Sequence, residues 1–93
     1  MNLSEEQLSE IESMAALFFA TEDIAINVGL TGEDAEYFNV AVEFKSVEPC
    51  SMAYYRGRLT AEIELRKSIK QSALNGSTPA QTAMLNFERE SRK

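Results

Sequence analysis

The stretch that decides the fold is TEDIAINVGLTGEDAEYFNV, residues 21–40. It opens with Thr21 and two acids, which is typical of a helix start because a capping oxygen satisfies a free amide and acids are favourable at the positive end of the helix dipole. Gly29 ends this helix, and Thr31 caps the next one. Apolar residues recur at helical spacing on one side: Ile24, Ala25, Val28, Leu30, Ala35 and Phe38. Val42, just after the stretch, continues them. The stretch therefore predicts two short helices joined by a tight turn.

Another short helix is predicted before this stretch. Ser4 to Gln7 forms a capping box, in which each residue satisfies a backbone amide of the other. The apolar residues that follow line one helix face: Leu8, Ile11, Ala15 and Phe18. We expect this helix to end near Ala20, so that residues 1–45 form a unit of three helices.

Small residues in this unit stand at the positions of a helix-turn-helix. Ala25 is placed where two helices would cross closely, and Gly29 stands in the turn four residues later. This spacing resembles the DNA-binding helix-turn-helix pattern. A three-helix packing unit that meets no nucleic acid also needs small residues at its crossings, so both interpretations stay open.

The outer side of the third predicted helix argues against DNA contact there. It carries Glu33, Asp34 and Glu36, and carboxylates are repelled by phosphates where a recognition helix must approach. We expect this face to meet protein or to be solvated. These carboxylates diverge along the helix, so they predict no metal site.

A new unit is predicted after Pro49, which pushes the preceding residue out of helical geometry. A long helix runs from Ser51 to Asn75, ended by Gly76, and Thr78 with Pro79 at the first helical position opens a last helix. The short connection turns that helix back antiparallel. The predicted fold is all-α, with a helix-turn-helix-like unit over 1–45, a linker over 46–50 and a helical hairpin over 51–93.

The long helix has two apolar faces. One carries Met52, Leu59, Ile63, Ala73 and Leu74, and the nearly opposite one carries Tyr54, Ala61, Leu65 and Ile69. The closing helix can cover only one face, so the other needs a partner. We predict a homo-oligomer with Tyr54, Leu65 and Ile69 at the subunit interface.

Gly57 lies inside the long helix, where glycine costs about 1 kcal/mol relative to alanine. Either the helix begins after this residue, or another backbone passes close to it.

The composition limits which kinds of catalytic and metal site the protein can contain. The 93 residues are 44% hydrophobic, as in one globular domain, with no His and a single Cys. This excludes a histidine base, a Cys/His dyad, an intrachain disulfide and a Cys/His zinc site. We predict no enzymatic activity, no cofactor and no metal. No run approaches the ~20 apolar residues of a membrane span and the start lacks a signal peptide's basic flank, which predicts a cytoplasmic protein.

The net charge of −6 is split along the chain. Residues 1–50 carry −10 and residues 51–93 carry +4. Such a chain can attract a copy of itself head to tail, or it can place its basic half on a phosphate backbone.

The basic residues fall into two groups. Arg58, Glu62, Arg66 and Lys70 follow at spacings of four, which is typical of a solvated helix face with weak ion pairs. The residues of the other group lack such partners: Arg56, Lys67, Arg89, Arg92 and Lys93. Together with Lys70 these five are the predicted DNA-binding residues, whereas Tyr54 and Tyr55 are expected to pack rather than to stack on bases.

The order of these elements resembles the small terminase subunit of tailed bacteriophages. The resemblance rests on the helix-turn-helix over 21–40 and on three later segments: AYYRGR at 53–58, LRKSI at 65–69 and NGSTPAQ at 75–81. It implies a non-catalytic DNA-packaging component that forms a ring, binds viral duplex DNA in the host cytoplasm and presents it to the large terminase subunit. The alternative is an acidic all-helical protein-interaction module that binds no DNA.

Overall fold

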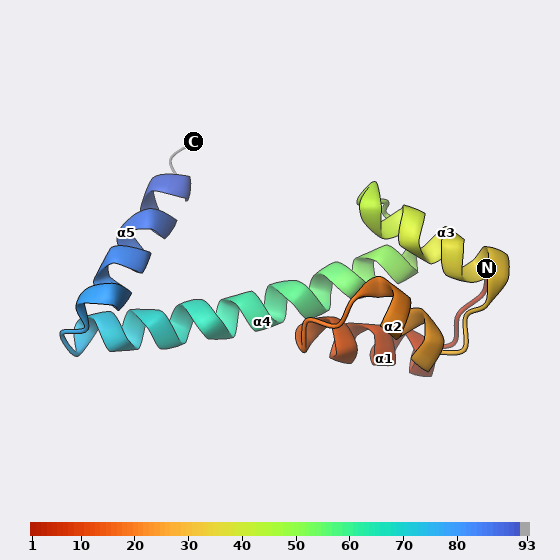
Figure 1. The fold of residues 1–93 in the computed structure, drawn as a ribbon, viewed down its shortest axis with the longest axis horizontal. Helices are drawn as coiled ribbons and strands as arrows, with labels where there is room; N and C mark the ends of the chain where they lie inside the picture. Colours follow the sequence, from red (N-terminus) through yellow and green to blue (C-terminus); the bar gives the residue numbers. More distant parts are fainter. Residues whose placement is uncertain (92–93) are drawn as a thin grey trace. The chain divides into compact units, whose positions relative to one another are not determined.

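The computed structural model describes residues 1–91, which form five α-helices and no strand (Figure 1). The helices are α1 (Glu5–Ala16), α2 (Thr21–Asn27), α3 (Gly32–Glu43), α4 (Pro49–Leu74) and α5 (Thr78–Ser91). The predicted all-α class is confirmed. The chain divides into two compact units, and α4 contributes to both. We call residues 1–61 the N-terminal unit and residues 62–93 the C-terminal unit.

The start of α1 follows the predicted capping box. The Gln7 amide donates to Ser4 Oγ at 3.1 Å, and the Ser4 amide donates to Gln7 Oε1 at 2.9 Å. This reciprocal pair satisfies two amides that a helix start leaves without partners. The capping box is confirmed.

Helices α1 to α4 end in one common way, with a left-handed residue after the helix and two hydrogen bonds back into its last turn. At α2 and α4 this residue is Gly29 (φ 82°) and Gly76 (φ 93°), as predicted. Glycine adopts this conformation without the steric cost that a Cβ brings.

The end of α1 differs from the prediction. Phe18 takes the left-handed conformation with φ 66°, so α1 stops at Ala16 and does not reach Ala20. The amides of Phe18 and Phe19 close the last turn by donating to the carbonyls of Ala15 and Met14. As a result Phe18 points away from the core and is 57% exposed. The prediction that it lies on the buried face of α1 is wrong.

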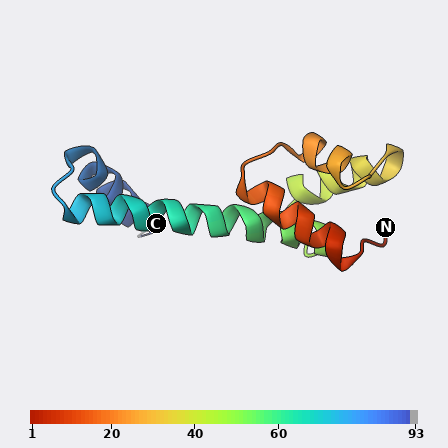
Figure 2. The same cartoon turned by 90° about the horizontal axis from the view of Figure 1, so that it is seen from below.

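The core of the N-terminal unit lies where α1, α2 and α3 surround the first turns of α4 (Figures 1 and 2). Its buried residues are Ile11, Ala15, Ile24, Ala25, Val28, Leu30, Phe38, Ala41, Val42, Cys50 and Ala53. Two polar contacts join its helices. Thr21 Oγ1 donates to Asn39 Oδ1 at 2.8 Å, and Gln7 Nε2 donates to the Val28 carbonyl at 3.0 Å.

The turn between α3 and α4 covers residues 44–48. It therefore begins and ends two residues earlier than the predicted linker, 46–50. Pro49 is the first helical residue of α4, two positions before the predicted start. A proline is well placed there because its missing amide would have no helical partner. Cys50 and Ala53 then enter the core, so the N-terminal unit extends past this turn to Ala61.

Gly57 lies inside α4, where the α1 backbone passes directly over it. A Cβ at position 57 would overlap the Glu12 carbonyl oxygen and would lie 3.0 Å from Ala15 Cβ. Of the two explanations for this glycine, the close approach of another backbone is therefore the correct one. The cost of glycine in the helix is offset by the packing distance that it allows.

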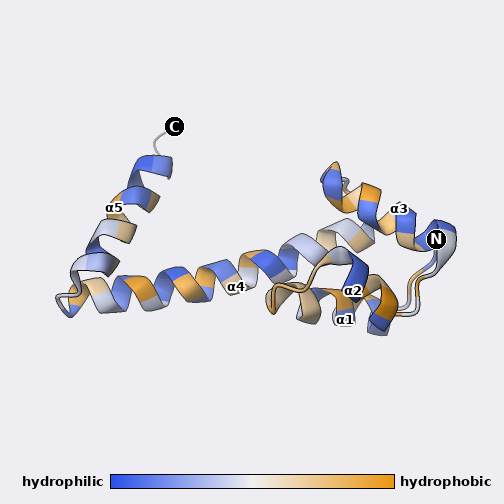
Figure 3. Ribbon diagram, in the orientation of Figure 1, coloured by the Kyte–Doolittle hydropathy of each residue, from blue (hydrophilic) through white to orange (hydrophobic). Residues whose placement is uncertain are grey.

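The C-terminal unit consists of the remainder of α4, the joint at Asn75–Ser77 and α5. Ser77, one residue before the predicted cap, precedes α5, and the Gln81 amide donates to its carbonyl at 3.0 Å. Along this part of α4 and along α5, polar and apolar residues alternate (Figure 3). No side chain between residues 62 and 91 is buried.

Candidate interaction surfaces

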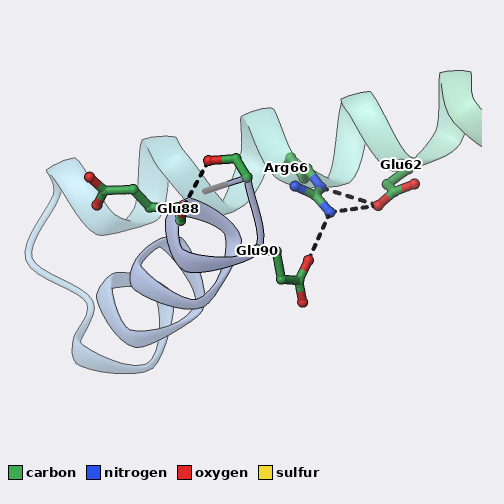
Figure 4. A network of polar contacts seen from close by, with 5 residues as sticks. Glu62, Arg66, Glu88 and Glu90 are labelled. Atoms are coloured by element: carbon green, nitrogen blue, oxygen red, sulfur yellow. Dashed lines mark hydrogen bonds and ion pairs between the residues drawn. The ribbon is translucent and has the colours of Figure 1, made fainter. Parts of the chain in front are cut away.

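A mixed contact around Arg66 joins α4 and α5. Arg66 Nη2 lies 2.7 Å from Glu62 Oε1 and 3.7 Å from Glu90 Oε2 (Figure 4). The Arg66 guanidinium also lies 4.0 Å from the centroid of the Phe87 ring. The predicted pair of Glu62 and Arg66 is confirmed. Spacing within one helix could not reveal the contacts to α5, because they depend on how the chain turns back.

A second contact shows which face of α4 meets α5. Gln81 Nε2 donates to the Ala73 carbonyl at 3.1 Å. Arg66, Ile69 and Ala73 follow at spacings of three and four and are all half-buried. The covered face of α4 is therefore the one that carries these three residues.

The apolar side chains outside this covered face are exposed. Leu65 is 54% exposed, Leu74 is 73% exposed, and Leu85 on α5 is 52% exposed. Leu85 also lines a shallow groove of about 520 Å³, together with Ala73, Gln81, Met84, Phe87 and Glu88. Because residues 62–91 bury no side chain of their own, this unit has apolar surface available for a partner.

The three predicted interface residues lie in different surroundings. Leu65 is exposed and Ile69 is half-buried on the face that meets α5. Tyr54 packs inside the N-terminal unit, with its ring 6.5 Å from the Phe38 ring and 5.2 Å from the Tyr55 ring in edge-to-face geometry. Tyr54 therefore belongs to the N-terminal unit, whereas Leu65 and Ile69 belong to the C-terminal unit.

Among the predicted DNA-binding residues, Lys67, Lys70 and Arg89 are exposed on the C-terminal unit. Arg56 belongs to the N-terminal unit, and its Nη1 lies 3.4 Å from Glu12 Oε1. Arg92 and Lys93 lie outside the described residues. In the described part of the C-terminal unit, the predicted DNA-binding residues are thus Lys67 and Lys70 on α4 and Arg89 on α5.

Arg58 lies between two aromatic rings, an arrangement that sequence reasoning missed. Its guanidinium is 5.2 Å from the centroids of both Phe18 and Tyr54. The spacing of four between Arg58 and Glu62 predicted instead that Arg58 lies on a solvated helix face. The left-handed turn at Phe18 brings that ring to Arg58, and no local spacing signals a contact over forty residues of chain.

The exposed side of α3 is both acidic and apolar. Glu33, Asp34 and Glu36 are exposed, as expected. Three apolar residues share this side, with Tyr37 and Val40 each 43% exposed and Phe44 76% exposed. A hydrogen bond to Glu48 raises the pKa of the Tyr37 hydroxyl. The spacing of 37, 40 and 44 is a helical signal for this second apolar face, whereas the outer side was predicted from its carboxylates alone.

The remaining candidate groups are placed as follows. Cys50 is buried in the N-terminal core, and burial raises the pKa of its thiol, so the thiol stays protonated at neutral pH. Within residues 1–91, no cluster of three or more Asp, Glu or Cys side chains is arranged to hold a metal ion. The described helices include none that is long and apolar enough to cross a membrane.

Comparison of the chain with protein-family models, with curated proteins and with solved structures finds no match.

Proposed function

We propose that the chain is a non-catalytic, homo-oligomeric adaptor that binds duplex DNA, similar to a small terminase subunit that presents DNA to a large motor subunit. The observation that carries self-association is the absence of any buried side chain between residues 62 and 91. A helical unit of this size has too small a core to be stable alone, and a second copy would cover its exposed leucines.

The N-terminal unit supports the helix-turn-helix part of this proposal. Helix α2, the turn at Gly29 and α3 follow in the order of that motif, and Thr21 and Asn39 join the two helices by a hydrogen bond. This unit carries eleven acidic and three basic residues, a net charge of −8. DNA contact is therefore assigned to the C-terminal unit, which has a net charge of +2.

Self-association is tested by replacing the two exposed leucines of the C-terminal unit. Leu65→Asp with Leu85→Asp is expected to reduce the mass in solution to that of the 10.4 kDa monomer, because carboxylates oppose burial of this surface. Size-exclusion chromatography with light scattering measures the mass. Both side chains lie in the C-terminal unit, so the N-terminal unit with its own core is expected to stay folded in the monomer.

The matched control is Leu17→Asp with Ile26→Asp, which changes two apolar residues of the N-terminal unit that are exposed even further, at 70% and 76%. It is expected to keep the wild-type mass. If the Leu65 and Leu85 variant also keeps that mass, the subunit interface lies elsewhere.

DNA contact is tested with Lys67→Ala combined with Arg89→Ala. Affinity is expected to fall equally for duplexes of unrelated sequence, and the slope of log K against log salt to become shallower by about 2, because each phosphate contact contributes about 0.9. Fluorescence anisotropy at several salt concentrations measures both. The mass of the variant is checked first, so that a lost assembly is not counted as a lost phosphate contact.

Asn39→Ala is the comparison for this experiment. Asn39 already accepts a hydrogen bond from Thr21, and it lies on the acidic helix, so its loss is expected to change affinity little. Loss of binding to one preferred sequence in this variant would make α3 a recognition helix and would contradict the assignment to Lys67 and Arg89.

The second candidate is an acidic protein-interaction module that binds no DNA. The exposed acids and apolar residues of α3 favour it. Absence of DNA binding by the wild-type chain at any salt concentration would select this candidate.

A further inference from the structure

The exposed side of α3 has the composition of a protein-binding face. Glu33, Tyr37, Val40 and Phe44 follow at spacings of four, three and four, so they lie in one row along the helix. Glu36 and Glu43 flank this row, at four residues before and three residues after Val40. All six side chains are exposed, whereas Phe38, Ala41 and Val42 fill the core on the other side. We call these six residues the acidic–apolar row.

The C-terminal part of α4 carries a row of the opposite charge. Ile63, Lys67, Lys70 and Leu74 also follow at spacings of four, three and four, and all four side chains are exposed. This row is distinct from the face with Arg66, Ile69 and Ala73 that meets α5. We call it the basic–apolar row.

We propose that the acidic–apolar row of one copy binds the basic–apolar row of a second copy. The inference rests on the proposed self-association and specifies one of its contacts. Lysine stems are apolar and pack over Tyr37 and Val40, while the ammonium groups reach the flanking carboxylates of Glu36 and Glu43. One apolar end of the basic–apolar row packs against the exposed Phe44 at the end of the acidic–apolar row.

Charge complementarity selects a second copy as the occupant of α3. The unit that carries the acidic–apolar row has a net charge of −8, and the unit that carries the basic–apolar row has a net charge of +2. Because the two rows have opposite charges and equal spacing, electrostatic attraction guides the two copies together and fixes the alignment of one row against the other. A contact between two different surfaces also leaves each copy able to bind two neighbours, which is how rings are built.

Reciprocal charge exchange tests this contact. One variant carries Glu36→Lys with Glu43→Lys, and the other carries Lys67→Glu with Lys70→Glu. Each variant alone faces like charges across the contact, so its dissociation constant should rise roughly tenfold. An equimolar mixture restores opposite charges at every contact between the two variants, so the mixture should recover the wild-type dissociation constant. Sedimentation velocity over a dilution series measures these constants.

The control for the Glu36 and Glu43 variant is Glu10→Lys with Glu64→Lys, which makes the same increase in net charge outside both rows. It should associate as the wild type does. Phosphates would bind the same two lysines, so duplex DNA is expected to compete with the contact, and the experiment is done without DNA.

The outcomes separate this inference from the proposed function. A wild-type chain that stays monomeric overturns the proposed self-association, and this contact with it. A wild-type oligomer whose affinity is unchanged in both variants overturns the contact alone. The contact is also overturned if each variant is weakened but the mixture is not restored, because the effect would then follow net charge or a contact within one chain.

Discussion

Gly57→Ala is expected to lower the free energy of unfolding of the N-terminal unit by about 2 kcal/mol. Alanine gains about 1 kcal/mol of helix propensity over glycine. Its methyl group, however, would overlap the Glu12 carbonyl oxygen, and forcing α1 away from α4 costs about 3 kcal/mol. Thermal unfolding followed by far-UV circular dichroism should show a midpoint roughly 10 °C lower.

The control for Gly57 is Ser13→Ala on the exposed side of α1. It raises helix propensity by a few tenths of a kcal/mol without a new contact, so the midpoint should stay or rise slightly. Both variants are compared with the wild type at one protein concentration, because self-association shifts apparent stability. A Gly57→Ala variant as stable as the wild type would show that the two backbones do not approach as described.

Phe38→Ala is expected to lower the free energy of unfolding by about 3 to 5 kcal/mol, as the loss of a fully buried aromatic ring does. Phe38 has no exposed surface, and its ring meets that of Tyr54, so it ties α3 to α4. This loss is a large fraction of the 5 to 15 kcal/mol that stabilises typical domains. Urea unfolding followed by circular dichroism measures it.

Phe44→Ala provides the matched control on the same helix. Phe44 is 76% exposed, so its truncation should change the free energy of unfolding of a single copy by no more than about 0.5 kcal/mol. Equal losses in the two variants would mean that the buried and exposed faces of α3 are not those described.

The start of α1 and two of the helix ends were predictable from the sequence because they depend on neighbouring residues. The predicted caps at Thr21 and Thr31 were wrong in detail, since Ala20 precedes α2 and neither threonine side chain accepts a cap hydrogen bond. The capping box of Ser4 and Gln7 closes within one turn, and Gly29 and Gly76 are residues for which the left-handed conformation carries no steric cost. The all-α class follows from the helical spacing of apolar residues over most of the chain. Each of these features is determined by residues that are only a few positions apart in the sequence.

Helix ends without glycine were not predictable in the same way. Phe18 and Lys45 adopt left-handed conformations that their side chains disfavour. Their backbone amides still donate to carbonyls of the preceding turn, which closes the helix. The local pattern of apolar residues continued past Phe18, so the end of α1 was predicted too late, whereas the end of the first unit at residue 45 lies close to the observed end of α3.

The surfaces of α4 show most clearly which features the local sequence pattern cannot predict. Its sequence determined that apolar residues lie on more than one side, and that a closing helix follows the glycine joint. Which side is covered was decided by the approach of α5 to Arg66 and Ala73. Likewise, the reason for Gly57 and the stacking of Arg58 on Phe18 depend on contacts between residues about forty positions apart. Periodicity reports the faces of a helix, whereas only tertiary packing selects the neighbour of each face.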